Sequence, residues 1–145
     1  MKQKLFAVFA GLTLLVAIGA CSPALTPTTF EVVLTPAQEV PPTDSASDAT
    51  GTANVTVAGN RLAIDGAWDG FDIVDPGAHV HGPALAGANA GILFALSYDN
   101  ASRTFEGTFT LDQEQMSNFL DNELYINLHS AAFPGGEIRG QITPP

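Results

Sequence analysis

The sequence contains a single cysteine, Cys21, so the chain cannot form an internal disulfide or build a metal site from several thiolates. Basic residues are also few: 5 Lys and Arg stand against 15 Asp and Glu, for a net charge of −10. An acidic surface repels phosphate groups and attracts cations, which excludes nucleic acids and anionic membranes as ligands. Histidine is scarce too, with three in the whole chain, so their positions are informative.

No apolar run is long enough to cross a membrane as a helix. The longest, LFAVFAGLTLLVAIGA, has 16 residues, whereas a transmembrane helix needs about 20. A short apolar run behind the basic start MKQK predicts a secretory signal peptide over residues 1–20. Its end, IGAC, resembles the lipobox of bacterial lipoproteins, which implies that Cys21 becomes the lipidated N-terminus. An ordinary cleaved signal followed by a coincidental cysteine is the alternative.

Export and lipidation set the expected domain organisation and location. Residues 21–29 are expected to be the lipidated cysteine and a tether rich in Pro and Thr, and residues 30–145 to form one domain. The protein would be secreted through the inner membrane and held by its lipid in the periplasm or at the cell surface. The mature chain keeps 3 basic and 15 acidic residues, a net charge of −12, and has no free thiol once Cys21 is acylated.

Short runs of β-forming residues, separated by turn residues, predict an all-β fold. Eight candidate strands can be recognised, at residues 29–35, 52–57, 61–68, 78–81, 91–98, 103–111, 123–130 and 137–142. Gly59 and Asn60 favour a tight hairpin between two of them. Residues 111–120 instead have helical spacing, and Asp112 with Gln115 predicts a capping box. These features indicate an antiparallel β-sandwich or Greek-key barrel of about eight strands, with one short helix over one end.

The three histidines lie in the segments AHVH and LYINLHS. Because strand side chains alternate between faces, His79 and His81 point together, opposite to the apolar Val80. In the second segment the leucines and isoleucine face the core, so His129 points away from it. Strand side chains two residues apart are roughly 6.5–7 Å from each other, which lets two imidazoles bind one ion. If the two segments are neighbouring strands, His129 completes a three-histidine site.

Several other polar residues are close to these histidines in the sequence. Candidates for orienting a ring or completing the coordination are Asp72, Asp75, Tyr125, Asn127, Glu137 and Arg139. Arg139 is expected to pair with one of the many carboxylates, and Glu39 to be a solvated loop residue. The glycine-rich loop of residues 84–91 can fold over an ion or leave it open. Three neutral imidazoles without sulfur favour copper, with zinc as the alternative, over magnesium or calcium.

Two long segments carry a family resemblance. HVHGPA and LYINLHSAAFPGGEIRGQI, about forty residues apart, resemble the CHRD domain, a module named after chordin, and AQEVPP and DATGTA fit the same pattern. This resemblance covers residues 28–142 and implies a β-sandwich, superoxide-dismutase-like or immunoglobulin-like, in an extracytoplasmic protein. HVH also resembles, more distantly, the copper ligands of copper/zinc superoxide dismutases, which implies copper binding by the three histidines. Because the histidines of a zinc site and the disulfide cysteines are absent, we expect a mononuclear site.

Three hypotheses about function follow. In the first, a lipid-anchored extracytoplasmic CHRD-domain protein binds one transition-metal ion, copper, for storage or delivery rather than for catalysis. In the second, a metal-free module holds an envelope protein or a polysaccharide. In the third, a copper enzyme handles superoxide. Histidines that lie far apart in space would favour the second hypothesis, and redox cycling of a bound ion would separate the third from the first.

Overall fold

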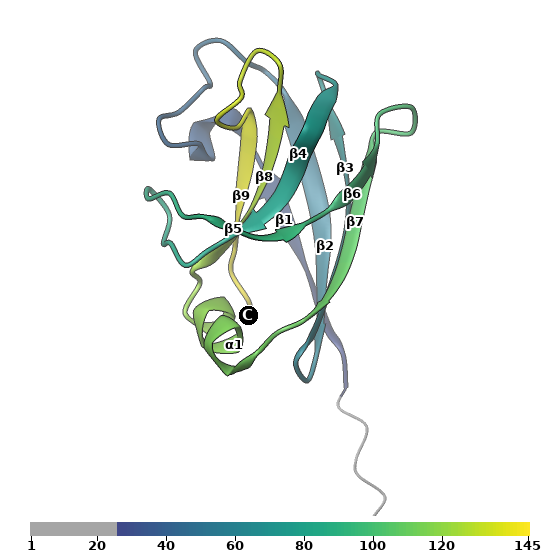
Figure 1. The fold of residues 1–145 in the computed structure, drawn as a ribbon, viewed down its shortest axis with the longest axis vertical. Helices are drawn as coiled ribbons and strands as arrows, with labels where there is room; N and C mark the ends of the chain where they lie inside the picture. The colour runs from purple at the N-terminus through teal and green to yellow at the C-terminus, as the bar shows by residue number, and fades with distance from the viewer. Residues whose placement is uncertain (1–25) are drawn as a thin grey trace, which may run out of the picture.

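The computed structural model describes residues 26–145, which form two antiparallel sheets packed face to face (Figure 1). One sheet has five strands in the order β1-β2-β3-β7-β6, and the other has four in the order β5-β4-β8-β9. The elements are β1 (Thr28–Leu34), η1 (Pro36–Gln38), β2 (Thr50–Ala58), β3 (Arg61–Asp69), β4 (Ile73–His81), β5 (Ile92–Ala95), β6 (Ser97–Asp99), β7 (Thr104–Thr110), α1 (Gln113–Leu120), β8 (Leu124–Ser130) and β9 (Ile138–Ile142). The prediction of an all-β sandwich is confirmed.

Two details of the predicted architecture change. Residues 91–98, expected to be one strand, form β5 in one sheet and β6 in the other, which raises the number of strands in residues 26–145 to nine. The chain crosses between the sheets at Leu96, whose side chain is buried in the core. Across residues 26–145 the two sheets do not join into a closed barrel, so the sandwich is the correct one of the two expected architectures.

Local sequence explains the two hairpins that matter most for the fold. Gly59 and Asn60 form the two-residue connection of the β2–β3 hairpin, in which Ala58 pairs with Arg61 and Gly59 has a positive φ of 61°. The segment from Pro134 to Gly136 turns the chain so that β9 runs antiparallel to β8. The hairpin at Gly59 and Asn60 confirms the prediction.

The helix α1 also agrees with its sequence signals. The Asp112 carboxylate accepts a hydrogen bond from the Gln115 backbone, and the Gln115 side chain accepts one from the Asp112 backbone, so the capping box is formed. The helix covers one end of the sandwich, as Figure 1 shows, and buries Phe119 there. Over residues 26–145, no helix has both the length and the apolar character that crossing a membrane requires.

The outer faces of the two sheets differ in exposure. On the five-stranded sheet the outward side chains, such as Thr52, Asn54 and Asp65, are exposed. On the four-stranded sheet, every residue of β8 from Leu124 to Leu128 is buried, although alternate side chains point to opposite faces. Both faces of this strand are therefore covered, one by the core and the other by something outside the sheet.

Two loops provide this cover, and we call residues 36–49 and 84–91 the cover loops. The first lies beside β9: the Gln141 N–H donates to the Gln38 side chain at 3.1 Å, and the Thr43 hydroxyl donates at 2.8 Å to the carbonyl oxygen of Glu137, just before the strand. The second is bound by the Gln141 side chain, which donates to the Ala84 carbonyl oxygen at 2.9 Å. The Asn89 side chain joins the loops to each other. The face that carries the histidines points outward from the sheet but is largely covered: His79 and His81 are buried, and His129 is partly exposed.

Candidate metal centre

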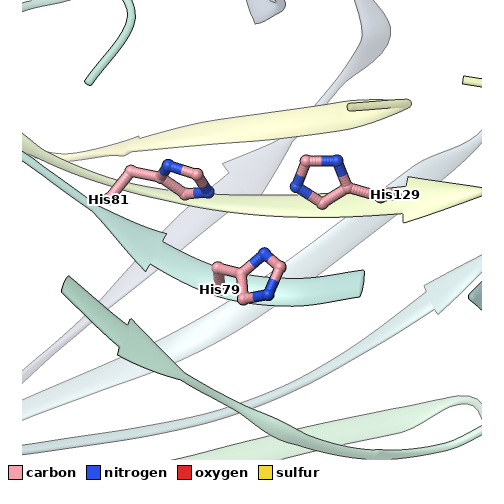
Figure 2. Close-up of side chains that lie close together, drawn as sticks. All are labelled: His79, His81 and His129. Atoms are coloured by element: carbon pink, nitrogen blue, oxygen red, sulfur yellow. The ribbon is translucent and has the colours of Figure 1, made fainter. Parts of the chain in front are cut away.

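The pairing of β4 with β8 brings the three histidines together. Figure 2 shows His79 and His81 on β4 and His129 on β8 with their rings pointing toward one another. The ring centroids are 5.5 Å apart for His79 and His81, 5.2 Å for His79 and His129, and 6.0 Å for His81 and His129. One nitrogen from each ring lies within 4.8 Å of the other two, so the three residues could hold a metal ion.

Hydrogen bonds fix which nitrogen of two of the rings is free. The Nδ1 of His81 lies 3.0 Å from the Ala90 carbonyl oxygen, and the Nδ1 of His129 lies 3.0 Å from that of Pro134. A carbonyl oxygen only accepts, so each Nδ1 carries the proton and each Nε2 keeps its lone pair. These two Nε2 atoms and the Nδ1 of His79 are buried and have no hydrogen-bond partner. Three partnerless nitrogens in one place are the donor set of an imidazole metal site.

Burial keeps these imidazoles in the form that binds metal. It lowers the pKa of His79 from 6.5 to about 4, with smaller contributions from the charges of His129 and His81. Burial also lowers the pKa of His81 and of His129, although the hydrogen bonds to the Ala90 and Pro134 carbonyl oxygens act in the opposite direction. All three rings are therefore neutral near pH 7, and a metal ion does not have to displace protons from them.

Tyr125 and Arg139 support the His81 ring from the side. The Tyr125 ring stacks on His81 with centroids 4.9 Å apart and planes at 11°, and the Arg139 guanidinium carbon lies 3.5 Å from the Tyr125 centroid. The Tyr125 hydroxyl accepts from the Ala90 N–H at 3.0 Å and is 3.3 Å from the Ala90 carbonyl oxygen. The same carbonyl oxygen therefore holds both His81 and Tyr125, and it belongs to a cover loop.

The predicted role of Arg139 needs correction. No carboxylate in residues 26–145 lies within ion-pair distance of its guanidinium, which instead donates to the Ala88 carbonyl oxygen at 2.7 Å and to the Gln141 side chain at 2.7 Å. A weaker bond reaches the Leu85 carbonyl oxygen. With 1% of its surface exposed, Arg139 is the first in size of the fully buried side chains in the described part of the chain, and it fastens a cover loop to the sheet.

Asn127 and Glu39 form a second buried polar group beside the histidines. Asn127 lies on the same face as the histidines, because it pairs with His79 across β4 and β8. Its Oδ1 and the Oε1 of Glu39 both lie within 2.6 Å of the place that a Cβ on Gly136 would take, and neither has a hydrogen-bond partner. The expectation of a solvated Glu39 is wrong, because it is 4% exposed and burial raises its pKa to about 7 despite the nearby Arg139.

The other predicted auxiliary residues occupy different positions. Glu137 is buried, accepts a hydrogen bond from the Ser47 hydroxyl at 2.7 Å and leaves its Oε2 without a partner. Asp75 is exposed, and its charge acts on the Tyr98 hydroxyl rather than on the histidines. Asp72 is also exposed and pairs with Arg103 at 3.7 Å. Of the acidic candidates, Glu137 is the one on the face that carries the histidines.

Comparison with known families decides what kind of domain this is. A sequence model of the CHRD domain matches residues 30–142, which include all three histidines, Glu39 and Arg139. This chain belongs to the CHRD domain family. No curated protein and no solved structure matched the chain. The family resemblance noted in the sequence is thus confirmed, whereas the likeness to superoxide dismutases stays a prediction.

Proposed function

We propose that this CHRD-domain protein binds one transition-metal ion through His79, His81 and His129. The observation that carries the proposal is the set of three buried, partnerless imidazole nitrogens within 4.8 Å of one another. A buried polar atom without a partner costs folding free energy, roughly 1–3 kcal/mol each. Three such atoms pointing to one place are explained together by one ion that accepts all three lone pairs.

The donor set selects the class of metal. Neutral imidazoles suit copper and zinc, whereas magnesium and calcium require oxygen ligands. Copper is the first choice because divalent copper binds nitrogen ligands more strongly than its neighbours in the first transition row. Zinc, which accepts three histidines and a further ligand, is the alternative. The low histidine pKa values favour retention of either ion in mildly acidic surroundings.

The location proposed for this protein is the extracytoplasmic side of a membrane. The signal-like residues 1–20 and Cys21 lie outside the described residues. This part of the proposal is supported by the sequence alone: the basic start MKQK, the apolar run that follows it and the motif IGAC. The role that fits a buried three-histidine site on an anchored domain is to bind, store or deliver the ion. We rank this role above superoxide turnover, which a dismutation assay on the copper-loaded protein would detect.

Metal loading of the mature protein tests the proposal. Protein incubated with Cu(II) or Zn(II), desalted and measured by elemental analysis should retain about one ion per chain. His79→Ala should retain a small fraction of that, while Asn54→Ala, an exposed residue on the other sheet, should match the wild type. Loss of the metal on desalting, or equal retention in His79→Ala, would reject the site and favour a metal-free module that binds an envelope protein or polysaccharide.

A further inference from the structure

An apolar groove lies at the end of the sandwich where the described chain begins. It measures about 300 Å³ and runs between α1, the start of β1 and the last residues of the chain. Its lining includes Thr26, Val57, Met116, Leu120 and Pro144. Figure 1 shows that α1, the start of β1 and the C-terminus all lie at this end of the molecule. The cover loops and the histidines contribute nothing to this groove.

The helix presents an unusual side chain beside the groove. Leu120 is 61% exposed, the highest value among the exposed large hydrophobic residues of the described chain. Met116, one helical turn earlier, is half-buried and lies on the same side of the helix. Phe119 between them turns inward and packs near Phe30. The outer side of α1 therefore carries apolar surface that no described residue covers.

The path of the chain indicates what covers this surface. Thr26 lines the groove, and Cys21 precedes it by five residues, which span at most about 18 Å when fully extended. A lipid on Cys21 would therefore keep this end of the domain within about 18 Å of the membrane surface. Under such a tether, a contact too weak to bind alone becomes effective, because it is an intramolecular step at high local concentration.

We propose that the groove and the exposed side of α1 dock on the surface of the lipid bilayer that holds the anchor; this inference rests on the proposed lipidation of Cys21. Leu120 and Met116 would enter the interfacial region, as apolar residues of membrane-surface helices do. Glu114 in this helix and Asp121 at its C-cap are acidic, and the helix has no basic residue, so the surface fits zwitterionic lipid rather than anionic lipid.

Spin labels on the lipidated mature protein in phosphatidylcholine vesicles test the docking. Acylation leaves no free thiol, so Leu120→Cys, Val33→Cys and Leu85→Cys each give one labelling site. All three positions are more than half exposed, but only position 120 lies at the groove. Upon vesicle binding, the label at 120 should gain oxygen accessibility and lose accessibility to a water-soluble nickel complex several-fold. The labels at 33 and 85 should not change.

Each failure of this experiment has its own meaning. Protein that does not remain with the vesicles would reject the anchor, and with it the inference. Protein that remains bound while the label at 120 behaves like those at 33 and 85 would reject the docking alone. Shielding of position 120 without vesicles would also reject it, because the chain itself or a second copy would then fill the groove. A second experiment places the spin label at position 117 through Ser117→Cys. Vesicle binding should change the oxygen and nickel accessibility of this label, and adding Leu120→Glu should abolish that change while the protein stays on the vesicles.

Discussion

The outer faces of the two sheets are both polar, but that of the five-stranded sheet is open to solvent whereas that of the four-stranded sheet is largely covered. Thr52, Asn54 and Asp65 on the former are exposed, whereas His79 and Asn127 on the latter are 5% and 3% exposed. The alternation of residues along the strands is the same in both sheets. The difference comes from the cover loops, which close over one polar face and leave the other open.

This difference teaches where to look for function. Exposed polar groups keep their hydrogen bonds to water, so they do not lower the stability of the fold. Buried polar groups lose those bonds and must find partners within the protein. On the covered face most of them do: Arg139, Tyr125 and Gln141 bond to the backbone of the cover loop. The exceptions are single atoms of the histidines, Asn127, Glu39 and Glu137. These partnerless atoms gather on the covered face around the proposed metal centre.

Among the predicted changes, removal of the Arg139 side chain should destabilise the covered face the most. Arg139→Met leaves the Ala88 and Leu85 carbonyl oxygens and the Gln141 Oε1 without their donor, and each such acceptor costs roughly 1–3 kcal/mol, so we expect a total loss of about 3–5 kcal/mol in the free energy of unfolding. Denaturant unfolding measures this loss. Arg61→Met, on the exposed face, should change stability by less than about 0.5 kcal/mol. Equal effects at the two positions would contradict the difference between the faces.

Metal addition should stabilise the covered face strongly. An ion that binds the folded protein alone adds about 4 kcal/mol when its free concentration is 1,000 times the dissociation constant. Unfolding curves with and without Cu(II) or Zn(II) should show this gain in the wild type and lose most of it in His129→Ala. Asn54→Ala on the open face should keep the gain. A gain that persists in His129→Ala would place the ion elsewhere.

The pH dependence of stability should identify the buried carboxyl group. The folded-state pKa of Glu39 is raised from 4.5 to about 7, so the folded protein binds this proton more tightly than the unfolded chain does. The stabilisation that comes from the protonated Glu39 carboxyl group is therefore fully present below pH 4.5 and is lost as the pH rises through 7. Glu39→Gln should remove this decline and be more stable than the wild type by about 2 kcal/mol at pH 8.

The matched control for this titration is Glu31→Gln, because Glu31 is exposed on the other sheet. Its unfolding free energy should follow the wild type between pH 5 and pH 8, with metal absent from all samples. The histidines act in the opposite direction, since their lowered pKa values reduce stability as the pH falls below 6.5. For this reason the difference between Glu39→Gln and the wild type, rather than either profile alone, reports on Glu39.

Removing one hydroxyl group should give the smallest effect. Tyr125→Phe keeps the stacking on His81 and the contact with Arg139 but loses the bonds to the Ala90 backbone, so we expect a loss of about 1 kcal/mol. Hydrogen exchange of the Ala90 amide should accelerate at the same time. Tyr98→Phe is the control, because Tyr98 belongs to the five-stranded sheet. Unchanged exchange at Ala90 in Tyr125→Phe would show that the cover loop is held by other bonds.

Most of the fold could be predicted from local patterns. The hairpin at Gly59, the helix capped by Asp112 and the orientation of the histidines all depend on neighbours in the sequence, and all three are confirmed. The division of residues 91–98 into two strands could not be predicted, because the crossing at Leu96 depends on the position of both sheets. The burial of Glu39 could not be predicted for the same reason, because it is created by residues such as Gly136 and Asn127, far away in the chain.

The sequence by itself determined the class of fold, the family and the three histidines on one side of their strands, because strand alternation and turn chemistry act over a few residues. Only the tertiary structure decided that the side opposite the core is also buried. The cover loops contain small and polar residues with no periodic pattern, and their place is set by distant donors, Arg139 and Gln141 on β9. Whether a polar face meets water or forms a closed site depends on such long-range contacts.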